Sequence, residues 1–186
     1  NNFKKVELNI TGELDEYNTV KLELDSGEAP GDIKEVYVDD FRLVSDVGGA
    51  LGLPVAVTYT VGYFDTYFTG WWDDRNAWTG YYDWANGTVN QGPTANGAHQ
   101  LDIGVGPATI HWYNSFATTP AFMVGVNADL EMGLGLWLAY GSNFDAIGEG
   151  TLSLEANYGM YIGDISLAVP VHFRYGLGSE AMSYMG

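Results

Sequence analysis

The chain has 186 residues, and its 24 Asp and Glu against 7 Lys and Arg give a formal net charge of -17. This charge excludes nucleic acid and anionic membrane surfaces as partners, because both are bound by clustered cationic side chains. The absence of Cys excludes a disulfide framework and a thiolate metal site. No apolar run reaches the ~18 residues that a transmembrane helix needs.

Four strands are predicted in the first half of the chain, at about 3–14, 19–25, 33–44 and 55–63. In three of them apolar and polar residues alternate, so each strand has one apolar and one polar face. The strand at 33–44 alternates less cleanly, because Val36 and Val38 conflict in parity with Phe41 and Leu43. The Gly-rich connection at 45–54 is expected to carry a short helical turn.

Six more strands are predicted in the second half, at about 99–105, 108–116, 121–130, 133–140, 151–160 and 165–175. The alternation is clearest in the last hairpin, Glu149–Tyr175, which has one continuous apolar face. Between the two halves, residues 64–98 form a long aromatic loop without sustained periodicity.

About ten alternating strands without an amphipathic helix predict an all-β fold, a transmembrane antiparallel β-barrel formed by residues 1–186 as a single segment. Strands of about 9 to 11 residues, tilted by about 45°, span a bilayer. Short connections alternate with longer ones, apart from the third, as periplasmic turns and external loops do in such barrels. Because the first connection is tight, both ends are expected on the outer side, and the chain is expected to be a fragment of a larger barrel.

Two stretches carry a resemblance to a known family. Phe3–Leu14 begins with an aromatic and two basic residues and ends in Gly12-Glu13-Leu14, and Gly52–Val55 leads into Val61-Gly62-Tyr63-Phe64. Both resemble strand patterns of Gram-negative outer-membrane porins, especially the phosphate/polyanion-type and related general porins. The resemblance implies a cofactor-free outer-membrane channel through which small hydrophilic solutes diffuse. An arginine and lysine ladder is absent, so phosphate selectivity is not implied.

Charged residues on the polar faces of the strands are predicted to line the pore. They are Lys5, Glu7, Glu13, Glu23, Asp25, Glu155 and Arg174. An Arg or Lys on the lipid face costs about 2–4 kcal/mol near the midplane, so charges are expected inside. Their excess of acid predicts a mild preference for cations, which reversal potentials showing anion preference would contradict.

The most distinctive stretch of the long loop is Trp71-Trp72-Asp73-Asp74-Arg75. Three interpretations stay open: the loop constricts the pore, the rings and acids bind a sugar, or the rings pack the loop against itself or its neighbours. Asp73, Asp74 and Asp83 have ligand atoms suited to calcium, but they lack an EF-hand spacing. A solvated acidic loop accounts for them more simply, and no metal site is predicted.

No catalytic set is recognisable, so the chain is predicted not to be an enzyme. His111 and His172 have no Ser or Asp at a suggestive spacing, and no G-x-S-x-G occurs. The expected partners of the porin are the lipid bilayer and small hydrophilic solutes, with a homotrimer left open.

The main alternative is a secreted β-sandwich that binds carbohydrate. Glu35–Leu43 resembles a strand of such modules, and Trp71, Trp72, Trp78 and Trp84 would form a stacking platform. A structural outer-membrane barrel with a blocked lumen is a third possibility.

Overall fold

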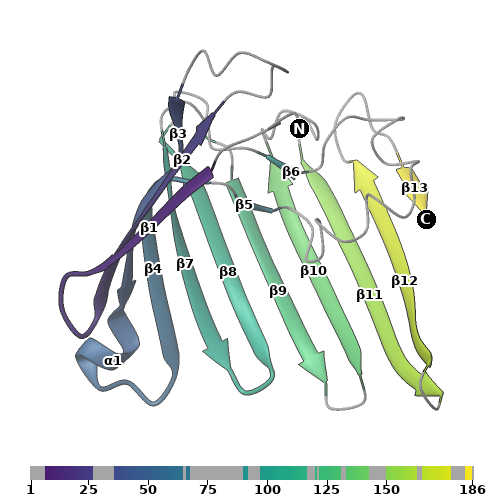
Figure 1. The fold of residues 1–186 in the computed structure, drawn as a ribbon. Coiled ribbons are helices and arrows are strands. Elements are labelled where there is room, and N and C mark those ends of the chain that lie inside the picture. Colours follow the sequence, from purple (N-terminus) through teal and green to yellow (C-terminus); the bar gives the residue numbers. More distant parts are fainter. Residues whose placement is uncertain are drawn as a thin grey trace.

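The computed structural model describes residues 7–26, 36–64, 66–67, 90–91, 97–116, 120, 122–130, 133–142, 150–162, 165–176 and 183–185. This part of the chain is built from strands and one short helix, α1 (Val47–Leu51) (Figure 1). The strands are β1 (Glu7–Glu13), β2 (Asn18–Ser26), β3 (Val36–Asp46), β4 (Ala56–Tyr63), β5 (Thr66–Tyr67), β6 (Asn90–Gln91), β7 (Ala98–Val105), β8 (Ala108–Ser115), β9 (Phe122–Leu130), β10 (Leu134–Ser142), β11 (Thr151–Ile162), β12 (Ile165–Gly176) and β13 (Ser183–Met185). None of the described segments is a helix long and apolar enough to cross a membrane.

One antiparallel sheet holds every strand except β5 and β6, in the order β1-β2-β3-β4-β7-β8-β9-β10-β11-β12-β13. Because this order follows the chain, the sheet is an up-and-down meander (Figure 1). The ten predicted strands are confirmed as β1–β4 and β7–β12, and with them the all-β antiparallel fold. The described sheet is not closed into a barrel, because β1 and β13 are its two edges.

The connections that follow β1, β7 and β9 are short and lie at one end of the sheet (Figure 1). In the first, Asp15 accepts hydrogen bonds from the backbone N–H of Tyr17 (2.8 Å) and from Asn18 Nδ2 (2.9 Å), as in other Asx turns. In the second, Gly106 has φ 59° and is followed by Pro107, the combination that a type II′ hairpin turn requires. These turns fix the register of the strands that they join.

The predicted helical turn between the third and fourth strands is confirmed as α1. The Asp46 side chain caps its N-terminus by accepting from the Gly49 N–H at 2.8 Å, and Gly52 ends it in the left-handed conformation at φ 62°. Gly48 is buried against the backbone of β4, where a Cβ would lie 2.7 Å from the Val57 nitrogen. The helix therefore lies at the same end of the sheet as the short turns.

A β-bulge explains why the faces of the third strand could not be assigned from the sequence. Asp40 pairs with Glu23 and Val38 pairs with Leu24, so residue 39 is an extra residue in β3. One extra residue reverses the parity of a strand. Val36 and Val38 consequently share a face of the sheet with Phe41 and Leu43, and the apparent conflict disappears.

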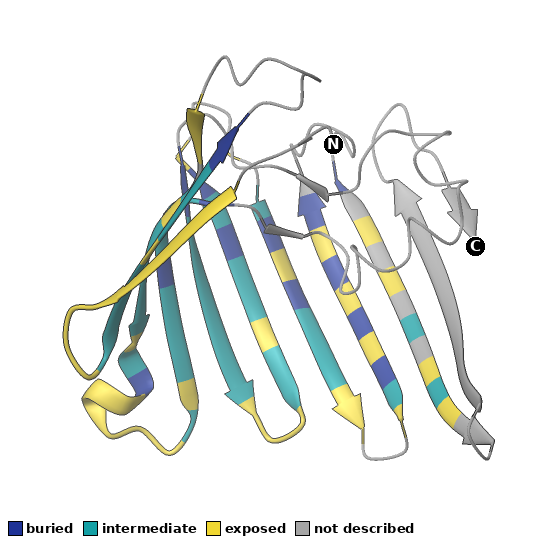
Figure 2. Cartoon of the chain, viewed as in Figure 1, coloured by how far each residue is buried: buried dark blue, intermediate teal, exposed yellow. Residues whose placement is uncertain are grey.

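The pairing register joins the apolar positions of all long strands into one continuous face, which we call the apolar face. At the paired positions of the described sheet, no Asp, Glu, Lys or Arg lies on it. Many of its large residues are exposed, among them Leu8, Ile10, Val124, Leu136, Leu138, Tyr140, Leu152, Leu154, Tyr158 and Met160, and others, such as Leu22 and Leu101, are half-buried. Figure 2 shows the resulting alternation of exposed and buried residues along β10.

Candidate functional site: the polar face of the sheet

The opposite side of the sheet, the polar face, brings most of the predicted pore-lining residues together. Glu7, Glu13, Glu23 and Asp25 lie on it in β1 and β2. Of Glu155 and Arg174 the structure describes the backbone, and the register pairs them with Trp137 and Ser153 of the same face. Lys5 lies outside the described residues. A shared face is what a lumen lining requires, and the lining itself stays a prediction.

Carboxylates concentrate at the β1–β3 side of the polar face. Glu7 is directly opposite Asp25, and Glu23 is directly opposite Asp40. Asp25 is only 2% exposed, and the Tyr37 hydroxyl donates to its Oδ2 at 3.5 Å. The acids of this side outnumber its two described bases, Lys21 and Arg42, which are directly opposite each other. The Arg42 guanidinium forms an ion pair of 3.0 Å with Asp40.

The chain leaves β4 toward the polar face at the start of the long connection. Gly62 has φ 148°, and a Cβ at this position would clash with the Phe41 carbonyl oxygen, so only Gly fits there. Two residues later Phe64 is buried, with its ring edge-on to that of Tyr113 at 6.2 Å. Arg42 lies over the same ring at 5.8 Å. Because Tyr113 and Arg42 both belong to the polar face, the connection begins over that face.

Trp71, Trp72, Asp73, Asp74 and Arg75 lie outside the described residues. The three interpretations of this stretch, as a pore constriction, a sugar platform or a self-packed loop, therefore stay predictions.

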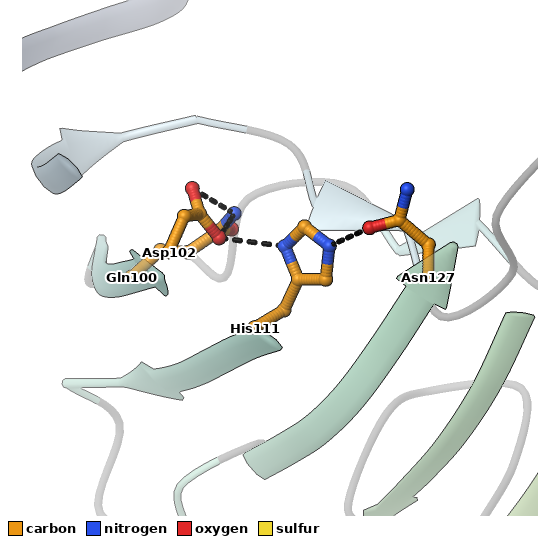
Figure 3. Close-up of polar contacts among 4 residues, drawn as sticks. All are labelled: Gln100, Asp102, His111 and Asn127. Atoms are coloured by element: carbon orange, nitrogen blue, oxygen red, sulfur yellow. Dashed lines mark hydrogen bonds and ion pairs between the residues drawn. The ribbon is translucent and has the colours of Figure 1, made fainter. Parts of the chain in front are cut away.

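A chain of hydrogen bonds crosses β7, β8 and β9 in the middle of the polar face (Figure 3). Gln100 Nε2 donates to both oxygens of Asp102, at 2.9 and 3.0 Å. His111 Nδ1 lies 2.6 Å from Asp102 Oδ1, and its Nε2 lies 2.6 Å from Asn127 Oδ1. Each ring nitrogen thus faces an oxygen acceptor, an arrangement that the doubly protonated imidazolium satisfies on both sides.

Sequence spacing did not reveal the contact between His111 and Asp102, which are nine residues apart. The signal that does reveal it is the tight turn at Gly106-Pro107. A two-residue loop pairs Val105 with Ala108, and counting outward along both strands places Asp102 opposite His111.

Trp137 completes this part of the polar face from β10. Its indole ring lies 5.2 Å from the His111 ring, and it is buried although it belongs to the polar face. Gly125 provides the room: a Cβ there would lie 3.3 Å from Trp137 Cζ2 and 3.2 Å from the Ala139 Cβ. Small residues on β9 and β10 therefore let the large ring lie flat along the sheet.

Several polar and aromatic residues of the apolar face lie near the strand ends, whereas Phe41 and Tyr59 lie in the middle of β3 and β4. At the end with the long connections, His99 packs against Trp112 at 4.7 Å and stacks on Phe116 at 5.1 Å. Tyr140 contacts Phe122 on neighbouring strands at a ring distance of 6.4 Å. At the other end, Asn18 and Ser45 hydrogen-bond to each other at 2.7 Å, which satisfies two polar groups on an apolar surface.

Within the described ranges, no group of three or more His, Asp or Glu residues could hold a metal ion. The pairs and chains of polar residues on the polar face contact one another instead. Comparison of the chain with protein-family models, with curated proteins and with solved structures finds no match.

Proposed function

We propose that the chain forms part of the wall of a porin in a bacterial outer membrane, a passive diffusion channel for small hydrophilic solutes. The observation that carries this proposal is the apolar face, which is uncharged at every paired position described and yet has many exposed large residues. Leu136, Leu138 and Leu154 are 37%, 43% and 47% exposed. Soluble monomers rarely expose such a continuous apolar surface, whereas a bilayer requires it.

Six of the described strands are long enough for this proposal, because about 9 to 11 tilted residues cross the hydrocarbon core. β2, β9 and β10 have 9 residues each, β3 has 11, and β11 and β12 have 12 each, whereas β4, β7 and β8 have 8. Trp112 and Tyr140 both pair with Val124, one from each side, near the end with the long connections. Aromatic rings at that level are typical of the interfacial girdle of a membrane barrel.

The carbohydrate-binding sandwich is less well supported. A sandwich packs the apolar faces of two sheets against each other at about 10 Å. The described residues contain one large sheet and the two-residue strands β5 and β6, and the apolar face of the large sheet is exposed.

In the proposed channel the polar face lines the lumen, and the short turns face the periplasm. The acids of β1–β3 favour cations, since they outnumber the bases of the same strands. The long connection begins over the polar face at Phe64, and of the three interpretations of Trp71, Trp72, Asp73, Asp74 and Arg75 we propose the pore constriction for this channel. No chemical step is needed, because solutes diffuse through a lumen that is lined by polar side chains.

The test is to purify the native, full-length protein in detergent and to add it to planar lipid bilayers. We expect detergent-dependent extraction, a change of gel mobility on boiling, and stepwise conductance increases with a larger permeability for cations than for anions. A chain that stays in solution without detergent, shows no mobility change and produces no conductance refutes the proposal. Binding of that soluble chain to glycans, lost in Trp71 and Trp72 variants, would establish the sandwich instead.

A further inference from the structure

We propose that His111 sets how strongly this channel prefers cations, because it switches the Asp102–His111 pair between a neutral and a singly negative state. The inference rests on the proposed function, since it needs the polar face to line a conducting pore. It names the solute class, inorganic and small organic cations, and one residue that determines selectivity.

His111 and Asp102 are so close together that a passing ion senses the sum of their two charges. Nδ1 of His111 and Oδ1 of Asp102 are 2.6 Å apart, so a positive ring and the carboxylate cancel each other as seen from the lumen. Loss of the ring proton leaves the carboxylate uncompensated. Gln100 and Asn127 hold the two partners in place but carry no charge, so they do not change this difference.

Both side chains of the pair are partly exposed on the polar face, which is the lumen side of the proposed channel. The His111 side chain is 18% exposed and that of Asp102 is 24% exposed, so an ion passing along the polar face can approach both. The same partial burial reduces screening by salt, which acts fully only on exposed charges.

Few other charges face His111 from the strands around it. On β7 the facing group is Asp102, and on β10 it is the uncharged Trp137. On β9 the neighbour is Asn127, with Asp129 two positions further along the same face. Its own strand contributes Tyr113, which is buried. The charge of this part of the wall is therefore expected to follow the protonation of His111.

The other two histidines of the chain provide the controls. His99 belongs to the apolar face, away from the lumen. His172 occupies a position of β12 that pairs with Glu155 on the polar face, so it is the residue that could produce a competing pH response.

The experiment measures reversal potentials of the full-length protein in a KCl gradient at pH 5 and pH 9, a range that includes the titration of histidine. In the wild type we expect the ratio of cation to anion permeability to rise by about tenfold, because one added negative charge at roughly 6 Å in water favours a passing cation by about threefold and disfavours an anion by the same factor. His111→Gln should show the higher ratio at both pH values, because Gln is uncharged at both and leaves the Asp102 carboxylate uncompensated. His172→Gln should keep the wild-type rise.

Each other outcome has a defined meaning. Conductance with the same ratio at pH 5 and pH 9 overturns the role of His111 and leaves the porin proposal standing, whereas absence of conductance overturns both. A rise that survives in His111→Gln and vanishes in His172→Gln assigns the effect to His172. If His111→Gln does not insert, Asp102→Asn decides, since it should lower the ratio at both pH values and keep the rise.

Discussion

A single charge placed on the apolar face tests whether this face contacts lipid or water. Leu138 is the central residue of β10, and it pairs with Val126 and Leu154 on the same face. Leu130 is the last residue of β9, next to the turn that joins β9 to β10. The substitutions Leu138→Arg and Leu130→Arg therefore make the same chemical change at two depths of the proposed membrane.

The expected difference between the two variants follows from depth. An Arg near the bilayer midplane costs about 2–4 kcal/mol, and one near the interface costs about 0–1 kcal/mol. The equilibrium constant of unfolding should thus change by roughly 30- to 700-fold for Leu138→Arg and by less than about tenfold for Leu130→Arg. In water the two positions are similar, since Leu138 is 43% exposed and Leu130 is 37% exposed. Surface substitutions there usually change stability by less than about 0.5 kcal/mol.

The assay is equilibrium unfolding in denaturant of the full-length protein folded into phospholipid vesicles, followed by tryptophan fluorescence. A free-energy cost for Leu138→Arg at least about 1.5 kcal/mol larger than that for Leu130→Arg supports a lipid-facing surface. Equal and small costs at both positions, together with stable folding in the absence of lipid, would show that the apolar face is exposed to water and that the porin interpretation is wrong.

Three further predictions use the same unfolding assay or NMR. Gly125→Val should destabilise by about 1–3 kcal/mol because its side chain displaces the indole beside it, whereas Gly12→Val, which has nothing within 4 Å, should be close to neutral; equal effects would contradict the packing of Trp137. Gly62→Ala should cost about 3 kcal/mol or more, because the new Cβ meets a backbone carbonyl at positive φ, whereas Gly106→Ala, at φ 59° in open space, should cost about 1–2 kcal/mol. The hydrogen bonds from Asn18 and from the Tyr17 N–H lower the pKa of Asp15 below 3.8, although slight desolvation opposes them. The turn is therefore fully stabilised above pH 3.8 and loses this contribution as the pH falls through the folded-state pKa; a carboxyl titration midpoint at or above 3.8 in the folded protein would refute it.

Much of the sheet could be predicted because alternation is a local property. Side chains of a strand alternate between its two faces, so a period of two in the sequence indicates a strand and sorts its residues without knowledge of any partner. The strands with clean alternation were found this way, and so was the common face of Glu7, Glu13, Glu23 and Asp25, whereas the strand that became β3 alternates less cleanly because of its bulge. The helical turn before Gly52 was predictable for a similar reason, since Gly frequently ends helices.

The part of the polar face around His111 needed the pairing of strands. Its partners Asp102, Asn127 and Trp137 come from three different strands, and only the register determines that they lie together. The entry of the long connection over the polar face likewise depends on Phe64 contacting Tyr113 and Arg42, which are distant from it in sequence.

By itself, the sequence determined strands with one apolar and one polar side, because the period of two is present within each strand apart from the bulged β3. The tertiary structure decided where the alternation between the two faces reverses and which side chains of different strands contact each other. Residue 39 is an extra residue only relative to β2, and Asp102 is the neighbour of His111 only across a hairpin. Bulges and cross-strand contacts are properties of two paired strands, so no pattern within one strand contains them.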